Sequence, residues 1–479
     1  MSQKFLTAIF ACTLILGCLL PARPEAAGTG GISLQEWKSI LRDDTLDLYL
    51  KGRCVGFYRQ SYAISEAAGT IEAETDLDAG GASERERLFA ADRRVFGFDG
   101  RLRSAEQKLK AAEGTSVWRL ARDTGETWSL TITSGGMART EPVQGVADNL
   151  TPTLEMYRGI KNRSIKTGDS FSDTTFDLTS GTPMTEVTRC IETPSTENGA
   201  LWVFSDLQSA VGRLDTLKID TAGATVFSGQ FPFVMRKRKG AGAPPSLVSL
   251  RDIAEALSVP APRAAAANET IALMLDSALA PDSSVLPFYR QQGTSWELGD
   301  MPSQCPASAD IPDHLQLPAG FTAPTVTMQS DNPKIKSLAD SLVQAAHTRC
   351  DSIDCCFRYV YRTLVKKLSP TFSNALETLE AGYGDCGEHA VLLGALLRAV
   401  GIPARAVLGL VYLPGKGYYY HAWVLAGTSG TWLFVDPTLG VFPAFRDRVP
   451  LLIDDSGSES VKLAKFIGRI EIEYVKKAK

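Results

Sequence analysis

The fold is decided by three motifs: Tyr383-Gly-Asp-Cys-Gly-Glu-His389, Tyr420-His-Ala-Trp423 and Trp432-Leu-Phe-Val-Asp-Pro-Thr438. They place Cys386, His421 and Asp436 in that order along the chain. A thiol, an imidazole and a carboxylate are the parts of an activated cysteine nucleophile, in which the imidazole takes the thiol proton and the carboxylate orients the imidazole. The sequence therefore predicts a catalytic triad formed by these three residues.

Cys386 is predicted to open a buried helix. The preceding Gly384-Asp385 is typical of a turn, and Gly401 followed by Pro403 is a usual helix end. Between them, apolar residues recur at helical spacing, at Ala390, Leu393, Leu397 and Val400. The first turn of a helix offers N–H groups without partners and the positive end of the dipole. These features favour a thiolate and could stabilise an oxyanion on an acyl substrate.

His421 and Asp436 are predicted to lie on neighbouring strands. The runs 406–412, 418–425 and 431–435 are rich in valine, tyrosine, tryptophan and phenylalanine, which is typical of strands. Neighbouring strands would bring the imidazole and the carboxylate side by side. Their spacing in the sequence does not by itself establish that proximity.

These residues resemble the core of the transglutaminase-like superfamily. The matching features are Gly-Asp-Cys-Gly-Glu-His at a helix start, Gly-Ile-Pro-Ala-Arg (401–405) at its end, His-Ala-Trp and Val-Asp-Pro-Thr. The resemblance implies a papain-related α+β domain with Cys386 as nucleophile, His421 as base and Asp436 as orienting residue. The superfamily includes protein cross-linkers, cysteine peptidases, peptide N-glycanases and members without catalysis, and the triad does not select among them.

Three residues next to the triad have two interpretations each. His389 lies on the helix face of Cys386 and could be a second base, although a structural role is the simpler interpretation. Glu388 is interpreted as a first-turn carboxylate favoured by the helix dipole. Trp423 is expected to pack beneath the site more than to contact the substrate.

Composition excludes several classes of function. The chain has 479 residues, enough for two to four domains, and a net charge of −4 with 22% charged residues. Without a global basic character, nucleic acid is not an expected partner. Four histidines and no Cys-x-x-Cys pair argue against a zinc site, and no Asp-rich loop supports calcium binding. We therefore expect no metal ion and no cofactor.

Residues 1–27 resemble an export signal. Lys4 precedes an apolar run over Phe5–Leu20 that is short for a membrane span. The segment Ile15-Leu-Gly-Cys18 resembles a bacterial lipobox, which would make a lipidated Cys18 a membrane tether, and cleavage near Ala26-Ala27 is the alternative. Both alternatives predict an exported protein of the periplasm or cell envelope.

Export would allow disulfides. Beyond the signal and Cys386, the chain has six cysteines, at 54, 190, 305, 350, 355 and 356. An even number in an oxidising compartment permits up to three bridges, whose connectivity the sequence cannot decide. The Cys350–Cys356 cluster is the best candidate for a local bridge, and buried free thiols are the alternative.

The fold class is predicted as α+β, with an N-terminal antiparallel β-rich region followed by the transglutaminase-like domain. Short alternating strands and regular turns over 33–258 predict a half-barrel or sandwich. Residues 264–330 are rich in proline and predict a small β module or a linker, and 331–479 form the catalytic domain. A half-barrel could hold an apolar ligand, although a scaffold or docking sheet is the simpler interpretation.

The leading hypothesis is an exported cysteine-dependent enzyme, a hydrolase or acyltransferase, that acts on amide bonds of protein or peptide through a thioester on Cys386. Hydrolysis, as by a cysteine protease, is slightly favoured over cross-linking because water is always present and no amine pocket is evident. The alternative is a non-catalytic envelope module that binds peptide or wall polymer, or a carrier built on the β region.

Overall fold

The computed structural model describes residues 33–80, 87–111, 114–123, 127–134, 137–208, 213–230, 233–238, 250–275, 279–305, 321–367, 373–428, 431–445, 447–454 and 459–477. The chain forms two compact units that divide between Ala256 and Leu257. Helix α4 (Leu250–Leu257) spans this boundary. The predicted signal at residues 1–27, with Cys18, lies outside the described residues. Among the described residues, no helix is both long and apolar enough to cross a membrane.

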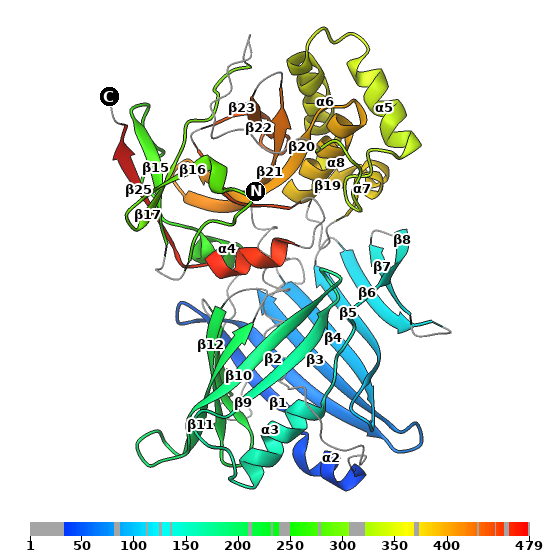
Figure 1. Ribbon diagram of the computed structural model, residues 1–479, viewed down its shortest axis with the longest axis vertical. Coiled ribbons are helices and arrows are strands. Elements are labelled where there is room, and N and C mark those ends of the chain that lie inside the picture. The colour runs from blue at the N-terminus through cyan, green and yellow to red at the C-terminus, as the bar shows by residue number, and fades with distance from the viewer. Residues whose placement is uncertain are drawn as a thin grey trace. The chain divides into compact units, whose positions relative to one another are not determined.

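The N-terminal unit is built on one antiparallel sheet of 14 strands (Figure 1). Its strands are β1 (Asp44–Leu50), β2 (Arg53–Ser65), β3 (Thr70–Gly80), β4 (Arg87–Gly97), β5 (Leu102–Ala111), β6 (Gly114–Arg122), β7 (Trp128–Ser134), β8 (Met137–Val143), β9 (Ser170–Asp177), β10 (Thr182–Glu192), β11 (Leu201–Gln208), β12 (Arg213–Asp220), β13 (Thr225–Gln230) and β14 (Phe233–Lys237). The order is β8-β7-β6-β5-β4-β3-β2-β1-β14-β13-β12-β11-β10-β9. Strands β1–β8 therefore run outward from the middle of the sheet to one edge, and β9–β14 run from the opposite edge back to the middle, where β14 pairs with β1.

A helix covers part of this sheet. Helix α3 (Thr151–Lys161) buries Met156 and Ile160 in a cluster with apolar residues of β10, β11 and β12, namely Cys190, Trp202, Phe204 and Ile219. Helix α2 (Leu34–Ile40) is capped by the Ser33 hydroxyl and lies beside α3 (Figure 1). The antiparallel β-rich region predicted from the sequence is confirmed, as a single large sheet.

A buried polar cluster connects the two halves of the sheet. Arg94 on β4 donates to the carboxylates of Asp92 and Asp148 and, over 3.1 Å, to the carbonyl of Phe176 on β9. Asp173, also on β9, is nearly buried beside these groups. Burial and the charge of Asp148 raise the pKa of its carboxyl group to about 8.

The C-terminal unit contains a five-stranded sheet with helices on it. The strand order is β23-β22-β21-β20-β24, with β20 (Ala404–Leu413), β21 (Gly417–Gly427), β22 (Trp432–Asp436), β23 (Val441–Ala444) and β24 (Arg448–Ile453). Helix α8 (Cys386–Ala399) packs on β20 and β21. It is surrounded by α5 (Pro333–Val343), α6 (Arg349–Thr363) and α7 (Ala375–Ala381) (Figure 1). Almost every side chain of α8 is buried, as its apolar sequence predicts.

Two smaller sheets complete this unit. One has the order β16-β17-β15-β25, formed by β15 (Glu269–Leu275), β16 (Tyr289–Gln292), β17 (Ser295–Leu298) and β25 (Ile470–Lys476), with the short 3-10 helices η2 (Leu286–Phe288) and η4 (Glu459–Phe466) nearby in sequence. The proline-rich segment 264–330 therefore shares its sheet with the end of the chain. The other sheet pairs β18 (Val365–Lys366) with β19 (Tyr383–Gly384) in parallel.

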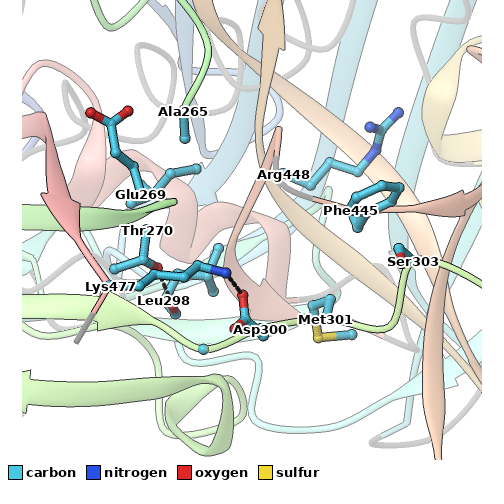
Figure 2. Close-up of a pocket in the computed structure, with 12 residues that line it drawn as sticks. Ala265, Glu269, Thr270, Leu298, Asp300, Met301, Ser303, Phe445, Arg448 and Lys477 are labelled. Carbon is cyan, nitrogen blue, oxygen red and sulfur yellow. Dashed lines mark hydrogen bonds and ion pairs between the residues drawn. The ribbon is translucent and has the colours of Figure 1, made fainter. Parts of the chain in front are cut away.

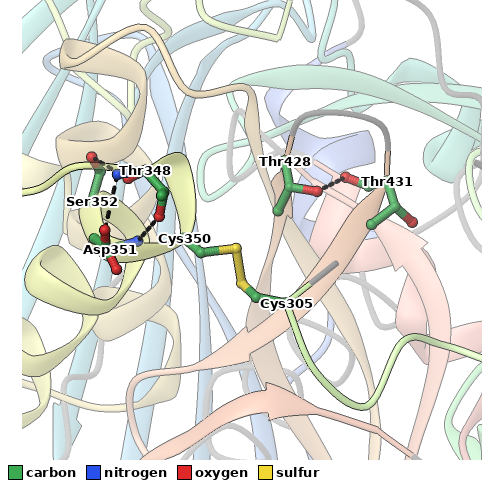
Figure 3. The surroundings of a disulfide bond; sticks show 7 residues. All are labelled: Cys305, Thr348, Cys350, Asp351, Ser352, Thr428 and Thr431. Atoms are coloured by element: carbon green, nitrogen blue, oxygen red, sulfur yellow. Dashed lines mark hydrogen bonds between the residues drawn. A yellow bond between two sulfur atoms is a disulfide. The ribbon is translucent and has the colours of Figure 1, made fainter. Parts of the chain in front are cut away.

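The disulfide differs from the one expected. Cys350 is bonded to Cys305, 45 residues earlier, with the Cα atoms 6.2 Å apart (Figure 3). The prediction of a local bridge within Cys350–Cys356 is wrong because the cluster lies on one helix. Five or six residues advance an α-helix by about 7.5 to 9 Å, more than a disulfide spans. Within the described part of the chain, the free cysteines are Cys54, Cys190, Cys355, Cys356 and Cys386.

Candidate active site

Cys386 is the first residue of α8. Asp385 caps the helix by accepting a 2.9 Å hydrogen bond from the Gly387 amide on its Oδ1, and Glu388 Oε2 accepts one of 3.0 Å from the Asp385 amide. This reciprocal capping box fixes the direction in which the chain enters the helix. A side chain at Gly384 would collide with that of Glu388, because an added Cβ would lie 2.3 Å from the Glu388 Cβ. The Gly-Asp-Cys-Gly-Glu sequence is thus required by packing as well as by capping.

The structure brings His421 and Asp436 together. His421 lies on β21 and Asp436 ends β22, and the register pairs Val424 with Val435 between them. His421 Nε2 and Asp436 Oδ2 are 2.8 Å apart, and both side chains are buried. With Nε2 bonded to the carboxylate, Nδ1 is the ring nitrogen left for proton transfer.

Cys386 lies against the residue that follows this histidine. The backbone of Ala422 donates a hydrogen bond to the Cys386 thiol group, which is only 6% exposed. Helix α8 packs on β21 over this region. The three residues predicted from the sequence therefore come from three elements: the start of α8, and β21 and the end of β22 in the sheet on which α8 packs.

Arg448 is a site residue that the sequence did not reveal. It opens β24, is fully buried, and its Nη2 donates a 2.6 Å hydrogen bond to the same Asp436 oxygen that His421 contacts. The other Asp436 oxygen accepts from the amides of Thr438 and Leu439. Burial alone would raise the pKa of Asp436, but His421 and Arg448 hold it well below its usual value. The only signal in the sequence was an arginine at the head of an apolar strand.

Burial and the helix start act in opposite directions on the pKa of the Cys386 thiol. Burial raises the pKa of Cys386 well above its usual value, and the charges of Asp385 and Glu388 act in the same direction, against the Ala422 hydrogen bond. Burial therefore opposes the thiolate that the helix start favours. Burial also raises the pKa of Glu388 well above its usual value. Desolvation by the strands above the helix start outweighs the helix dipole.

Two neighbouring residues have structural contacts. His389 is fully buried with its Nδ1 2.6 Å from the Asp385 carbonyl, and burial lowers its pKa. Trp423 is buried, with its ring centroid 6.3 Å from that of His421 and 5.5 Å from that of Phe434. Gly409 makes room for it, because a Cβ there would lie 2.7 Å from the Trp423 ring. These contacts agree with a packing role for Trp423 beneath the imidazole.

A cavity of about 220 Å³ lies elsewhere in the same unit. Thr270, Asp300, Met301, Phe445 and Lys477 line it together with part of Arg448 (Figure 2). Lys477 and Asp300 form an ion pair on one side of it. Cys386, His421 and Asp436 do not line this cavity, although Arg448, which contacts Asp436, does.

Comparison with known proteins identifies this region. Residues 336–437 match the sequence profile of the transglutaminase-like superfamily, a range that contains Cys386, His421 and Asp436. This part of the chain is a transglutaminase-like domain. The fold class predicted from the resemblance, α+β with a β-rich N-terminal region, is therefore confirmed.

Solved structures with some likeness are few and distant. A candidate cysteine protease from Cytophaga hutchinsonii is 17% identical over 45% of this chain and 84% of its own, with a TM-score of 0.28. The periplasmic domain of TgpA from Pseudomonas aeruginosa, bound to ethylmercury, is 18% identical over 55% and 73%, with a TM-score of 0.20. A candidate protease from Parabacteroides distasonis is 12% identical over 74% and 69%, with a TM-score of 0.21. No curated protein matches the sequence significantly.

Proposed function

We propose that the chain is an exported cysteine-dependent enzyme that acts on amide bonds of protein or peptide. The observation that carries this proposal is the buried chain of contacts Arg448–Asp436–His421 beside the thiol-bearing start of α8. Export rests on the signal-like residues 1–27, and lipidation of Cys18 would add a membrane tether. The transglutaminase-like domain supports a cysteine enzyme without selecting its acyl acceptor.

In the proposed mechanism the resting site holds a thiol. His421 Nδ1 takes the Cys386 proton as the sulphur attacks the amide carbon, and Asp436 holds the imidazole and stabilises the imidazolium. The Cys386 amide N–H has no acceptor among the described residues, which suits it to donate to the oxyanion. His421 then gives its proton to the leaving amine, and a thioester remains on Cys386.

The acyl acceptor decides the class of the enzyme. Water attacking the thioester gives hydrolysis, and a second amine gives cross-linking, with His421 removing the acceptor's proton in both cases. Hydrolysis is favoured because water needs no dedicated subsite. The carrier alternative for the N-terminal unit has less support, because α3 covers the apolar surface of β10–β12.

The test is turnover of fluorogenic peptide libraries by the full chain. We expect Cys386→Ser to lower turnover by at least about 10³-fold and His421→Ala to lower it comparably, since residues that act as a unit lose nearly everything singly. Cys355→Ser, which changes a partly exposed thiol on α6, is the matched control and should keep the activity. Turnover that survives Cys386→Ser would contradict the proposal. Adding a primary amine separates hydrolysis from cross-linking by the product formed.

A further inference from the structure

Two lysines lie beside the segment that leads into Cys386. Strand β18 pairs in parallel with β19, with Lys366 opposite Gly384. The Lys367 amide donates a 3.0 Å hydrogen bond to the carbonyl of Gly384, two residues before the thiol. These backbone bonds fix both lysines next to the turn that starts α8. Their position is therefore set by the same residues that set the position of Cys386.

Each lysine is held over a tyrosine ring. Lys366 Nζ lies 4.3 Å from the ring centroid of Tyr361, and Lys367 Nζ lies 4.3 Å from that of Tyr383. Such contacts hold a cation in place without neutralising its charge. Neither lysine forms an ion pair within the part of the chain that the structure describes.

The Tyr361 ring connects this pair to the rest of the site. A Cβ at Gly440 would lie 2.6 Å from its ring atoms, and the Gly440 amide donates to the Asp436 carbonyl. On its other side the ring stacks on Phe357, 6.1 Å between centroids. The ammonium group of Lys366 therefore lies over the Tyr361 ring, which packs against the turn after Asp436.

The acidic groups nearby are bonded to residues other than the two lysines. Asp385 is occupied by the helix cap and Asp436 by His421 and Arg448. Glu388 is occupied by the amides of Ser373 and Asp385, from which it accepts hydrogen bonds. Lys366 also acts with burial to lower the pKa of His389, which places the lysine within electrostatic reach of the first turn of α8. None of these three carboxylates is bonded to either lysine, so both ammonium groups are available to a further anion.

We propose that Lys366 and Lys367 form a carboxylate-binding subsite, so that preferred substrates carry a carboxylate within a residue or two of the reacting amide. The proposal rests on the cysteine-enzyme function proposed above and names its substrate class. The carboxylate can come from an acidic side chain or from a free peptide C-terminus. Both sources present the same group to the two ammonium ions.

The first experiment compares matched peptides with the full chain. One pair differs by glutamate against glutamine beside the scissile amide, and a second pair by a C-terminal acid against an amide. If the subsite binds a side-chain carboxylate, the glutamate peptide should have the higher kcat/KM of the first pair. If it binds a C-terminal carboxylate, the acid should have the higher kcat/KM of the second pair. The preference should fall by roughly 10-fold in Lys366→Gln/Lys367→Gln, on the scale of two partly exposed ion pairs. It should also weaken as salt is raised.

Lys416→Gln is the control, since Lys416 is an exposed lysine in the turn between β20 and β21. The control should keep the full preference. An acid preference in both peptide pairs that the double lysine variant leaves unchanged would overturn the subsite. Equal loss with the acid and the neutral peptide would overturn it too, because it would show a structural effect.

A second readout does not need turnover. Alkylation of Cys386, followed by peptide mapping, is measured with the anionic reagent iodoacetate and the neutral reagent iodoacetamide. We expect the ratio of the two rates to fall several-fold in the double lysine variant and to stay unchanged in Lys416→Gln. An unchanged ratio in the double variant refutes the subsite. If no peptide is cleaved but the ratio falls, the proposed function has failed while the subsite stands.

Discussion

Replacing Arg448 by methionine should destabilise the C-terminal unit strongly. The arginine side chain is 1% exposed and that of Asp436 is fully buried, with 2.6 Å between Nη2 and Oδ2. Methionine keeps much of the apolar stem and removes the charge. Asp436 would then be a buried carboxylate with only His421 and two backbone amides as partners.

The expected loss follows from breaking a buried ion pair on one side, about 3 to 5 kcal/mol. Arg448 Nε has no hydrogen-bond partner among the described residues, so the arginine already bears part of its own desolvation cost. We therefore expect the lower end, about 3 kcal/mol. For a unit of this size that corresponds to a fall in Tm of roughly 6 to 12 °C.

The assay is urea unfolding of the full chain, read by the transition of the C-terminal unit, with a double-mutant cycle against Asp436→Asn. In the asparagine background the same Arg448→Met change should be much milder, because no buried carboxylate is left unpaired. The pH dependence gives a second check. Asp436 has a folded-state pKa below its unfolded one, so its contribution is present above about pH 4 and is lost in acid. The difference between wild type and variant should therefore shrink toward pH 3.

Two outcomes would refute this reasoning. One is a loss below about 1 kcal/mol, which is typical of an exposed ion pair. The other is an equal loss in the wild-type and Asp436→Asn backgrounds, which would mean that Arg448 stabilises the unit through Asp447 or through packing.

Two further predictions concern buried titratable groups. Since burial raises the pKa of Cys386, its alkylation by iodoacetamide should stay slow at pH 7 and rise only above about pH 8.5; fast labelling at pH 6 would instead show a resting thiolate. Asp173→Asn should stabilise the N-terminal unit by up to about 4 kcal/mol at pH 7 and hardly at all at pH 4. The folded pKa near 8 lies above the unfolded one, so stability is full below about pH 4 and is lost as the pH rises toward 8. Urea unfolding at both pH values checks this prediction. Asp177→Asn is the control, because Asp177 caps the following turn and its replacement should lower the stability of the unit. Equal effects of Asp173→Asn at pH 4 and pH 7 would contradict the prediction.

The parts of the fold that could be predicted are those encoded by local periodicity. The helix after Cys386 and the strands bearing His421 and Asp436 were each visible as apolar patterns with turn residues at their ends. The pairing of β15 with β25 joins segments about 200 residues apart. No pattern in either segment indicates that it pairs with the other. The Cys305–Cys350 disulfide could not be predicted for a similar reason, because six cysteines permit many pairings.

The same distinction, between local patterns and contacts distant in sequence, applies to the residues of the candidate site. Its triad stood in recognisable motifs, whereas Arg448 became visible only when β24 was placed beside β20, across the sheet from β22. The effect of burial on the Cys386 thiol could not be predicted either, because the helix dipole is a local property of α8. Desolvation of Cys386 depends on the strand that passes over the helix start, and no pattern within α8 reports it.

The charge balance of the site explains why a buried thiol and an ionised Asp436 can coexist. Arg448 already pairs with Asp436, so the carboxylate does not present an uncompensated negative charge to its surroundings. The hydrogen bond to His421 then serves mainly to hold the imidazole in one orientation. In the mechanism proposed above, the positive charge that His421 gains with the Cys386 proton is matched by negative charge developing on the substrate oxygen. The proposed mechanism thereby couples proton transfer to attack on the amide, so that we expect Cys386 to become nucleophilic only when a substrate fills the site.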